Sequence, residues 1–266
     1  MTPHIPTSFN LPATVVLVGG LDPGGGAGVL RDLLTTVALG ARGEVVGTAW
    51  TEQGVPSTRA IEPRGPERVQ VALAAALARV GTAGSAVKIG MVASTPIAQA
   101  IETALRAYAG PVVYDPVVQA SSGDALYQGD RSTILAAILA LARRSTLLTP
   151  NLGEAAWLLD RPVRNESDAR AAARDLRALG IAAVLVKGGH LEGDATDVLL
   201  SPAGESIFSS PRIAGPSPRG TGCALASAIA VGLARGKPVE HAVASAKTWL
   251  TQPIASAHSV GDERHL

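Results

Sequence analysis

The heptapeptide VVYDPVV (residues 112–118) is the segment of this sequence that most directly indicates its fold. It is a short, almost continuous apolar run, and AVKIGMV (86–92) is a second one. Such runs are typical of strands buried on both faces, which occur in parallel sheets covered by helices. Strand-like and helix-like segments alternate along the rest of the chain. The alternation predicts the α/β class, with a mostly parallel central sheet and helices on both faces.

Apolar spacing, together with Gly and Pro positions, locates the other elements. We expect further strands at 14–20, 44–50, 146–151 and 182–189, and a hairpin at 197–208 around Pro-Ala-Gly. Helices are expected at 27–40, 66–81, 95–110, 130–144, 167–179, 221–235 and 238–257. In these helices, Thr95 is expected to act as a cap, Gly40 as a stop and Pro253 as an interruption.

Composition excludes several classes of protein. Of 266 residues, 47% are hydrophobic, and the net charge of +1 without long like-charge blocks argues against a nucleic-acid-binding surface. A single cysteine excludes an intrachain disulfide and a cysteine-rich zinc site. The absence of an early basic segment and of a long apolar run predicts a cytoplasmic protein that does not bind a membrane. Residues 1–12 are expected to form a flexible leader and 13–266 a single domain.

Polar or glycine-rich clusters follow nearly every predicted strand, where ligands bind in such sheets. One cluster, GGLDPGGGAG (19–28), partly fits a dinucleotide-binding fingerprint, with Glu44 as a candidate acid. Gly24 and Gly26 match that pattern, but Val29 stands in place of its third glycine. A tight strand-to-helix turn is the alternative interpretation. It explains two or three of the glycines and leaves the rest of the run unexplained.

Three residues after predicted strands point to magnesium. Asp115 interrupts an apolar strand, where a carboxylate is costly unless it is paired or bound to a cation. Asn151 and Glu154 stand three apart at the opening of a helix. One or two carboxylates together with phosphate oxygens suit Mg²⁺. Helix capping by Asn151 and a favourable helix-dipole position for Glu154 are the alternatives.

Lys187 and the segment PRGTGC (218–223) point to phosphate. Lys187 ends a strand before two glycines, in a chain with 19 arginines and four lysines, and either neutralises phosphate or lies on the surface. In PRGTGC, a helix begins at the only cysteine, and such a helix start binds anions. The helix start is expected to lower the pKa of Cys223, so that thiolate is present near neutral pH and accepts a proton. The alternative is a cysteine that only packs.

Taken together and in order, these motifs resemble the ribokinase-like superfamily. Within it, they resemble the hydroxymethylpyrimidine/phosphomethylpyrimidine kinases of thiamine synthesis. The resemblance covers about residues 14–250. The matching segments are LDPGGGAG with Asp32 in the next helix, TEQ, KIGM, DPVV, SSGDAL, TPNLGEA, VKGGHLEG and GTGC.

The resemblance implies a ribokinase-like kinase that is usually a homodimer. Such a kinase uses ATP and Mg²⁺ to phosphorylate a small molecule, the hydroxymethyl group of an aminopyrimidine and then its monophosphate. It also implies a role for each matching residue, as follows. Gly20, Gln53, Met91 and Val117 line the pyrimidine pocket with Asp32 close by; Asp115 and Glu154 bind the metal; Asn151 and Lys187 lie near the nucleotide phosphates; and Gly220, Thr221, Gly222 and Cys223 form the anion hole, with Cys223 as base.

Some positions depart from the family pattern. Ser121 replaces a lysine of the S-G-D flap, Arg219 replaces a histidine before G-T-G-C, and Glu52 adds charge near the predicted pocket. Arg219 is expected to compensate in part for the missing lysine and to contact phosphate. Two alternatives stay open on this basis. One is a pyridoxal-type kinase, and the other is a degenerate paralogue that binds a pyrimidine without turnover.

Overall fold

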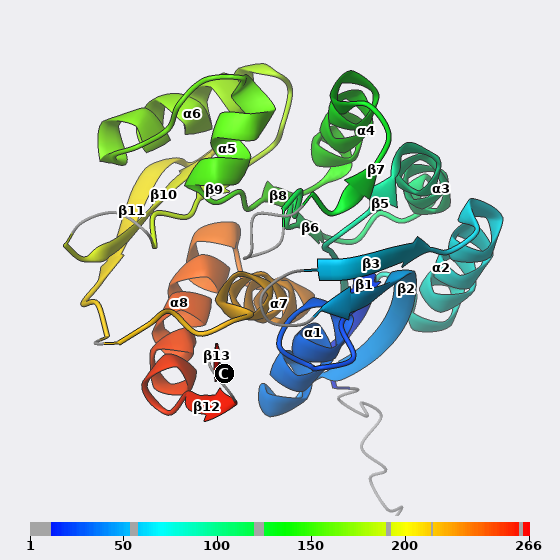
Figure 1. The fold of residues 1–266 in the computed structure, drawn as a ribbon, viewed down its shortest axis with the longest axis horizontal. Helices are drawn as coiled ribbons and strands as arrows, with labels where there is room; N and C mark the ends of the chain where they lie inside the picture. Colours follow the sequence, from blue (N-terminus) through cyan, green and yellow to red (C-terminus); the bar gives the residue numbers. More distant parts are fainter. Residues whose placement is uncertain (1–11, 54–57, 120–124, 190–192, 214, 261–262) are drawn as a thin grey trace, which may run out of the picture.

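The computed structural model describes residues 12–53, 58–119, 125–189, 193–213, 215–260 and 263–266. Its main sheet has the strand order β11-β10-β9-β8-β6-β4-β1-β2-β3 (Figure 1). The strands are β1 (Thr14–Leu21), β2 (Arg42–Gln53), β3 (Thr58–Pro63), β4 (Ser85–Ile89), β6 (Val112–Tyr114), β8 (Leu147–Leu148), β9 (Val184–Val186), β10 (Ala195–Ser201) and β11 (Gly204–Ser210). The strands from β9 to β2 in this order all pair in parallel, which confirms a mostly parallel sheet. Antiparallel pairing occurs at the two edges, between β2 and β3, between β9 and β10, and between β10 and β11.

Helices cover both faces of the sheet (Figure 1). One face carries α1 (Gly28–Ala38), α7 (Thr221–Ala234) and α8 (Val239–Ala255). The other carries α2 (Pro66–Val80), α3 (Thr95–Leu105), α4 (Arg131–Arg144), α5 (Leu152–Leu159) and α6 (Glu166–Ala178). Successive residues of β1 enter opposite cores, with Leu17 facing the first set of helices and Val16 the second. The continuous apolar strands therefore have the two buried faces that the sequence predicted.

Two predicted helix signals are wrong. Thr95 is the first residue of α3, and Ser94 takes the capping position without a side-chain cap bond. Pro253 does not interrupt α8, which continues to Ala255. Proline removes one N–H, and near the end of a helix few turns remain to be disturbed. The start of α2 at Pro66 and the end of that helix at Gly81, with a φ of +65°, agree with the expectation.

Several short strands were not predicted. The largest is the edge strand β3, which pairs antiparallel with the end of β2. Its sequence TRAIEP carries one large apolar residue, Ile61, so it lacks the pattern that identifies a buried strand. The others form two small sheets, β5 (Ala93–Ser94) with β7 (Tyr127–Gln128), and β12 (His258–Val260) with β13 (Glu263–His265).

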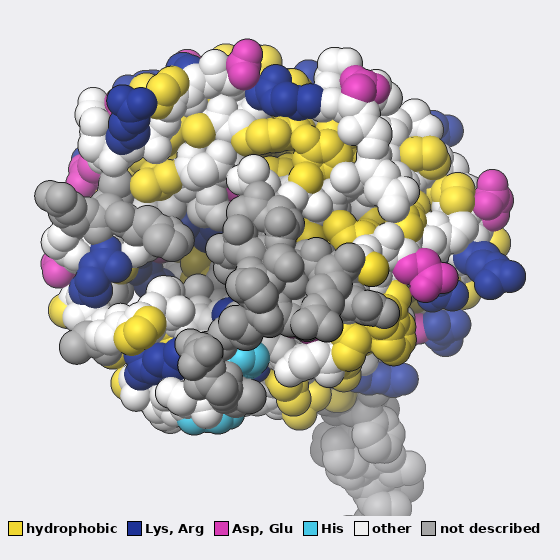
Figure 2. All heavy atoms as spheres, in the orientation of Figure 1, with side chains coloured by type: hydrophobic (Ala, Val, Ile, Leu, Met, Phe, Trp, Pro, Cys, Tyr) yellow, Lys and Arg dark blue, Asp and Glu magenta, His cyan; other side chains and the backbone are white. Residues whose placement is uncertain are grey.

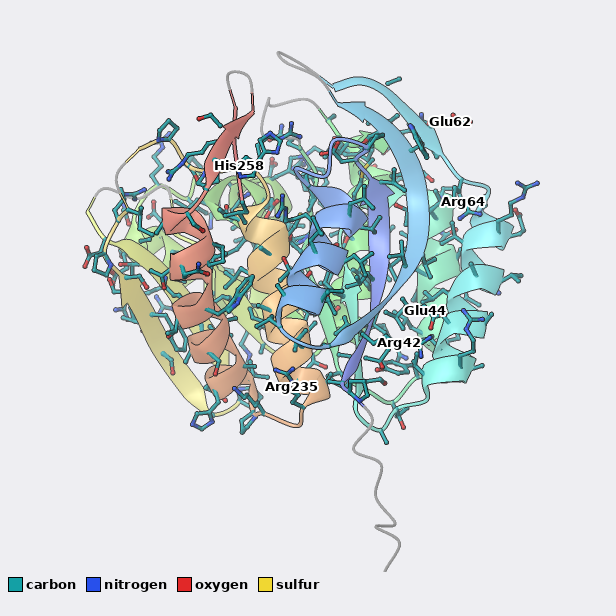
Figure 3. All side chains as sticks on the ribbon, turned by 90° about the horizontal axis from the view of Figure 1, so that it is seen from below. Arg42, Glu44, Glu62, Arg64, Arg235 and His258 are labelled. Atoms are coloured by element: carbon teal, nitrogen blue, oxygen red, sulfur yellow. The ribbon has the colours of Figure 1, made fainter. Side chains whose placement is uncertain are left out.

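The direction of the elements locates the functional end of the molecule. Figure 3 shows Arg42, which begins β2, and Arg235, which follows α7, at the same end. The carboxyl ends of the parallel strands and the amino end of α7 therefore lie together at the opposite end. Basic side chains are scattered over the face seen in Figure 2. In the described part of the chain, no helix has the length and apolar character needed to cross a membrane.

Candidate active site

A cavity of about 580 Å³ opens where the strands end and α7 begins. Its lining brings together residues that are far apart in the sequence. Among the predicted site residues, it includes Asp115, Val117, Asn151, Glu154, Lys187, Arg219, Gly220, Thr221, Gly222 and Cys223. One cavity therefore holds all the residues that were assigned to metal, phosphate and the anion hole.

Asp115 and Lys187 form an ion pair at the floor of this cavity. Asp115 follows β6 and is 1% exposed, and its Oδ1 lies 2.6 Å from Lys187 Nζ. Thr149 Oγ1 also donates to this oxygen at 3.2 Å. Burial lowers the pKa of Lys187, but Asp115 and Glu154 raise it by more, so the ammonium stays charged. The interpretation of Lys187 as a surface lysine is wrong, since its side chain is 12% exposed.

Asn151 and Glu154 form a capping box at the start of α5. Asn151 Oδ1 accepts from the Glu154 N–H at 2.8 Å, and Glu154 Oε2 accepts from the Asn151 N–H at 2.7 Å. Helix capping, the alternative for Asn151, is therefore confirmed, and Glu154 lies in the first turn of α5, as its helix-dipole alternative expects. Glu154 nevertheless lines the cavity, 4.0 Å from Lys187 Nζ, and burial raises its pKa to about 7 despite the opposing effect of Lys187.

The amino end of α7 packs against two other segments. Gly220, the residue before the helix, has a φ of +82°, and a Cβ there would lie 2.3 Å from the Gly26 carbonyl oxygen. The glycine-rich loop and the PRGTGC segment thus meet backbone to backbone, which only glycine allows. A Cβ on Gly222 would lie 3.2 Å from Lys187 Nζ. The first N–H groups of the helix, which have no partner within it, therefore lie beside a buried ammonium.

The pKa of Cys223 differs from the sequence prediction. Cys223 is half-buried and lines the cavity, and enclosure by the protein raises its pKa to about 11, although Lys88 acts in the opposite direction. Removal of water disfavours the thiolate more than Lys88 stabilises it, and Asp32 and Asp115 raise the pKa further. The prediction of an accessible thiolate near neutral pH is therefore wrong.

We accordingly expect iodoacetamide to modify Cys223 more slowly than free cysteine at pH 7. Thiolate is the reactive form, and a pKa of about 11 means that the rate rises with pH up to that value. Since the chain has one cysteine, the mass increase of the intact protein reports this residue alone. A rate at pH 7 above that of free cysteine would contradict the raised pKa.

The residues present fit a magnesium ion that shares its ligands with phosphate. Asp115 and Glu154 supply two carboxylates on one wall of the cavity. Within the described residues, no group of three or more His, Cys, Asp or Glu side chains is placed to hold a metal. Mg²⁺ commonly takes one or two carboxylates and completes its shell with substrate phosphates and water. The donor set suits an ion that arrives with a nucleotide.

Comparison with known proteins identifies the family. The family model described as phosphomethylpyrimidine kinase matches residues 22–266. The chain belongs to this family. A hydroxymethylpyrimidine/phosphomethylpyrimidine kinase from Streptomyces coelicolor is 38% identical over 96% of this chain and 94% of its own length. The kinase class expected from the sequence is thus confirmed.

Solved structures of the family and its neighbours agree with the fold. Phosphomethylpyrimidine kinase from Clostridium difficile is 30% identical, with a TM-score of 0.77, over 91% of this chain and 99% of that one. Bacillus subtilis pyridoxal kinase, solved as an ADP complex, is 27% identical with a TM-score of 0.84, over 94% of each chain. The ribokinase-like fold class is confirmed.

The residues implied to bind the pyrimidine are only partly brought together. Gly20 and Met91 are buried neighbours, because a Cβ on Gly20 would lie 2.8 Å from Met91 Sδ. Val117 lines the cavity. Asp32 does not, and it is fully buried in a pair with Lys88. Gln53 lies at the end of β2, but its side chain, that of Glu52 and all of Ser121 lie outside what the structure describes.

Sequence reasoning missed three groups around this site. Asp22 is 1% exposed and accepts from the Gly24 and Ala27 N–H groups at 3.0 Å. It also lies 3.5 Å from Arg219 Nη2. Lys247 pairs with Asp197 on the cavity wall at 2.7 Å. Lys88, the third, was detectable, because it interrupts an apolar strand as Asp115 does.

Proposed function

We propose that this protein phosphorylates 4-amino-5-hydroxymethyl-2-methylpyrimidine and its monophosphate with ATP, in thiamine biosynthesis. The observation that carries the proposal is the position of the amino end of α7 beside the Lys187–Asp115 pair, in a member of the phosphomethylpyrimidine kinase family. Free N–H groups and a fixed ammonium are what a transferring phosphoryl group requires. The acceptor is a small molecule whose hydroxymethyl oxygen attacks the γ-phosphorus of ATP while the bond to ADP breaks.

The residues predicted to bind metal and phosphate and to form the anion hole each have a role in this proposal. Lys187 neutralises charge on the nucleotide phosphates, and the N–H groups of Gly220, Thr221, Gly222 and Cys223 stabilise the moving phosphoryl group. The Cys223 sulfur, as thiolate, takes the proton of the attacking hydroxyl. Asp115 and Glu154 would hold Mg²⁺, which would neutralise phosphate charge. Asn151 keeps Glu154 in place through the capping box.

Arg219 supports the proposal as a second positive group. Its side chain lines the cavity, is 18% exposed and is oriented by Asp22. Since it lies directly before the anion hole, it is suited to meet charge on a phosphate. This is how we interpret the replacement of the family histidine.

An assay of ADP release over a small panel of hydroxymethyl heterocycles tests the function. We expect turnover with the hydroxymethylpyrimidine and its monophosphate. Turnover with pyridoxal alone would favour a pyridoxal-type kinase, an alternative supported by the similarity to the Bacillus subtilis enzyme. Pyrimidine binding by calorimetry without any ADP release would favour the degenerate paralogue.

Asp115→Asn is expected to raise the magnesium concentration needed for half-maximal turnover, because one of two carboxylates is lost. Pyrimidine binding should stay nearly unchanged, since Asp115 is engaged by Lys187 and Thr149 on the phosphate side. Magnesium titrations of the ADP-release rate measure the first effect, and calorimetry without nucleotide measures the second. A collapse of pyrimidine affinity with an unchanged magnesium requirement would rule out the metal role.

A homodimer is part of the same proposal. Large apolar side chains are exposed on α1 and β2, where Leu34, Val37 and Trp50 are 54%, 59% and 52% exposed. Contact with a second copy would bury them. Size-exclusion chromatography with light scattering measures the mass of the particle in solution. We expect twice the 26.9 kDa mass of the chain.

A further inference from the structure

Three of the four lysines in this arginine-rich chain form ion pairs with aspartates inside the protein. Lys187 and Lys247 do so on the cavity wall. The Lys88–Asp32 pair does not line the cavity, and its side chains are 1% and 0% exposed. Burying a pair of charges costs free energy that their attraction often fails to recover. The position of Lys88 therefore suggests a role other than stability.

A hydrogen bond joins α1 to α7. Ser227 Oγ donates to Asp32 Oδ1 at 2.9 Å. Cys223 and Ser227 are four residues apart, so they lie on the same face of α7. The second oxygen of Asp32 accepts from Lys88 Nζ at 2.7 Å. A continuous network thus connects Lys88 to α7 at Ser227, one helical turn after Cys223.

Strand β4 is built to hold this ammonium. Lys88 projects to the same side as Ala86, which packs in the core beneath α7 and α8. A Cβ on Gly90 would lie 2.9 Å from Lys88 Nζ. The glycine of KIGM therefore leaves the space that the charged end of Lys88 occupies.

Charged groups on several elements act electrostatically on Cys223. These are Lys88 on β4, Arg31 and Asp32 on α1, Asp115 after β6 and Lys187 after β9. Burial lowers the pKa of Lys88, but Asp32, Cys223 and Asp115 together raise it above the usual value. Lys88 therefore remains protonated at neutral and moderately alkaline pH.

We propose that Lys88 is a positioning residue of this kinase: held by Asp32, its ammonium favours the thiolate form of Cys223 from inside the protein. The inference rests on the proposed function, in which the thiolate takes the proton of the acceptor hydroxyl. Lys88 touches no substrate in this arrangement and acts through its charge. It supplies the positive charge that partly offsets the burial of the sulfur.

Alkylation of Cys223 by iodoacetamide between pH 7 and 10, without substrates, tests this charge directly. In Lys88→Met, we expect the pH profile to move up by about one unit or more, so that the rate at a given pH falls about tenfold. In Asp32→Asn, which removes the opposing charge with little change of shape, we expect the profile to move to lower pH. Lys237→Met is the control, since Lys237 is an exposed lysine after the far end of α7, and its profile should equal that of the wild type.

Circular dichroism checks that each variant is folded, because Lys88→Met leaves Asp32 unpaired. Lys88→Met/Asp32→Asn compared with Asp32→Asn removes the ammonium without leaving a buried carboxylate unpaired, so this comparison decides the question if Lys88→Met does not fold. An unchanged profile on loss of the ammonium overturns the proposal, and so does an equal shift in Lys237→Met. Turnover gives a separate readout: Lys88→Met should lower kcat and leave the acceptor KM unchanged. No ADP release by the wild type would overturn the proposed function, whereas the alkylation profiles test the charge of Lys88 independently.

Discussion

Cys223→Ala is expected to lower turnover by roughly 10²–10⁴, the range for losing a positioned proton acceptor. Alanine fits a helix start without strain, so the fold and nucleotide binding should stay intact. The remaining rate should come from the α7 N–H groups and Lys187, which the substitution leaves in place. The ADP-release assay measures turnover, and calorimetry measures nucleotide binding.

The pH dependence distinguishes a proton acceptor from a packing residue. With a pKa of about 11, about one Cys223 in 10⁴ is thiolate at pH 7. A mechanism that needs the thiolate therefore predicts that kcat/KM of the wild type rises about tenfold per pH unit between pH 7 and 9. Cys223→Ala should remove this rise. Full turnover in Cys223→Ala, or a flat profile in the wild type, would require another group to take the proton.

Cys223→Asp extends this test. A carboxylic acid has a much lower intrinsic pKa than a thiol, so at neutral pH a larger fraction of it is ionised when burial raises the pKa of either group. We expect part of the lost activity to return and the pH profile to move to lower values. Activity equal to that of Cys223→Ala at every pH would show that an ionised group at this position does not assist the reaction.

Lys187→Met is expected to lower kcat by about 10²–10³, a loss typical of removing one group that stabilises transition-state charge. The acceptor KM should change little, because Lys187 contacts Asp115 and the start of α7 on the phosphate side. Lys187→Arg should recover only part of the rate, since a planar guanidinium does not fit a site built around a compact ammonium.

Lys237→Met is the matched control for this variant. Lys237 is exposed near the far end of α7, where it bonds to Ser245 Oγ, and its loss should leave turnover unchanged. Thermal unfolding should be recorded for Lys187→Met, because the substitution leaves Asp115 buried without its main partner. A folded Lys187→Met with wild-type kcat would remove Lys187 from the proposed mechanism.

Local patterns in the sequence predicted much of the fold. The two-sided apolar strands predicted a parallel sheet, and the structure has the two buried faces that this requires. The spacing of Asn151 and Glu154 predicted a helix start, and both form a capping box. These features depend on neighbours within a few residues. The edge strand β3 escaped prediction because its pairing with β2, and not its own pattern, makes it a strand.

The same distinction holds for the active site. Sequence by itself determined which residues end the strands and begin α7, because strand direction and helix starts are encoded locally. Only the tertiary structure decided which charges meet, joining Lys187 to Asp115 and Lys88 to Asp32 across long stretches of chain. It also decided the protonation of Cys223, since a pKa depends on the water and charges around a group, and these are set by segments remote in sequence.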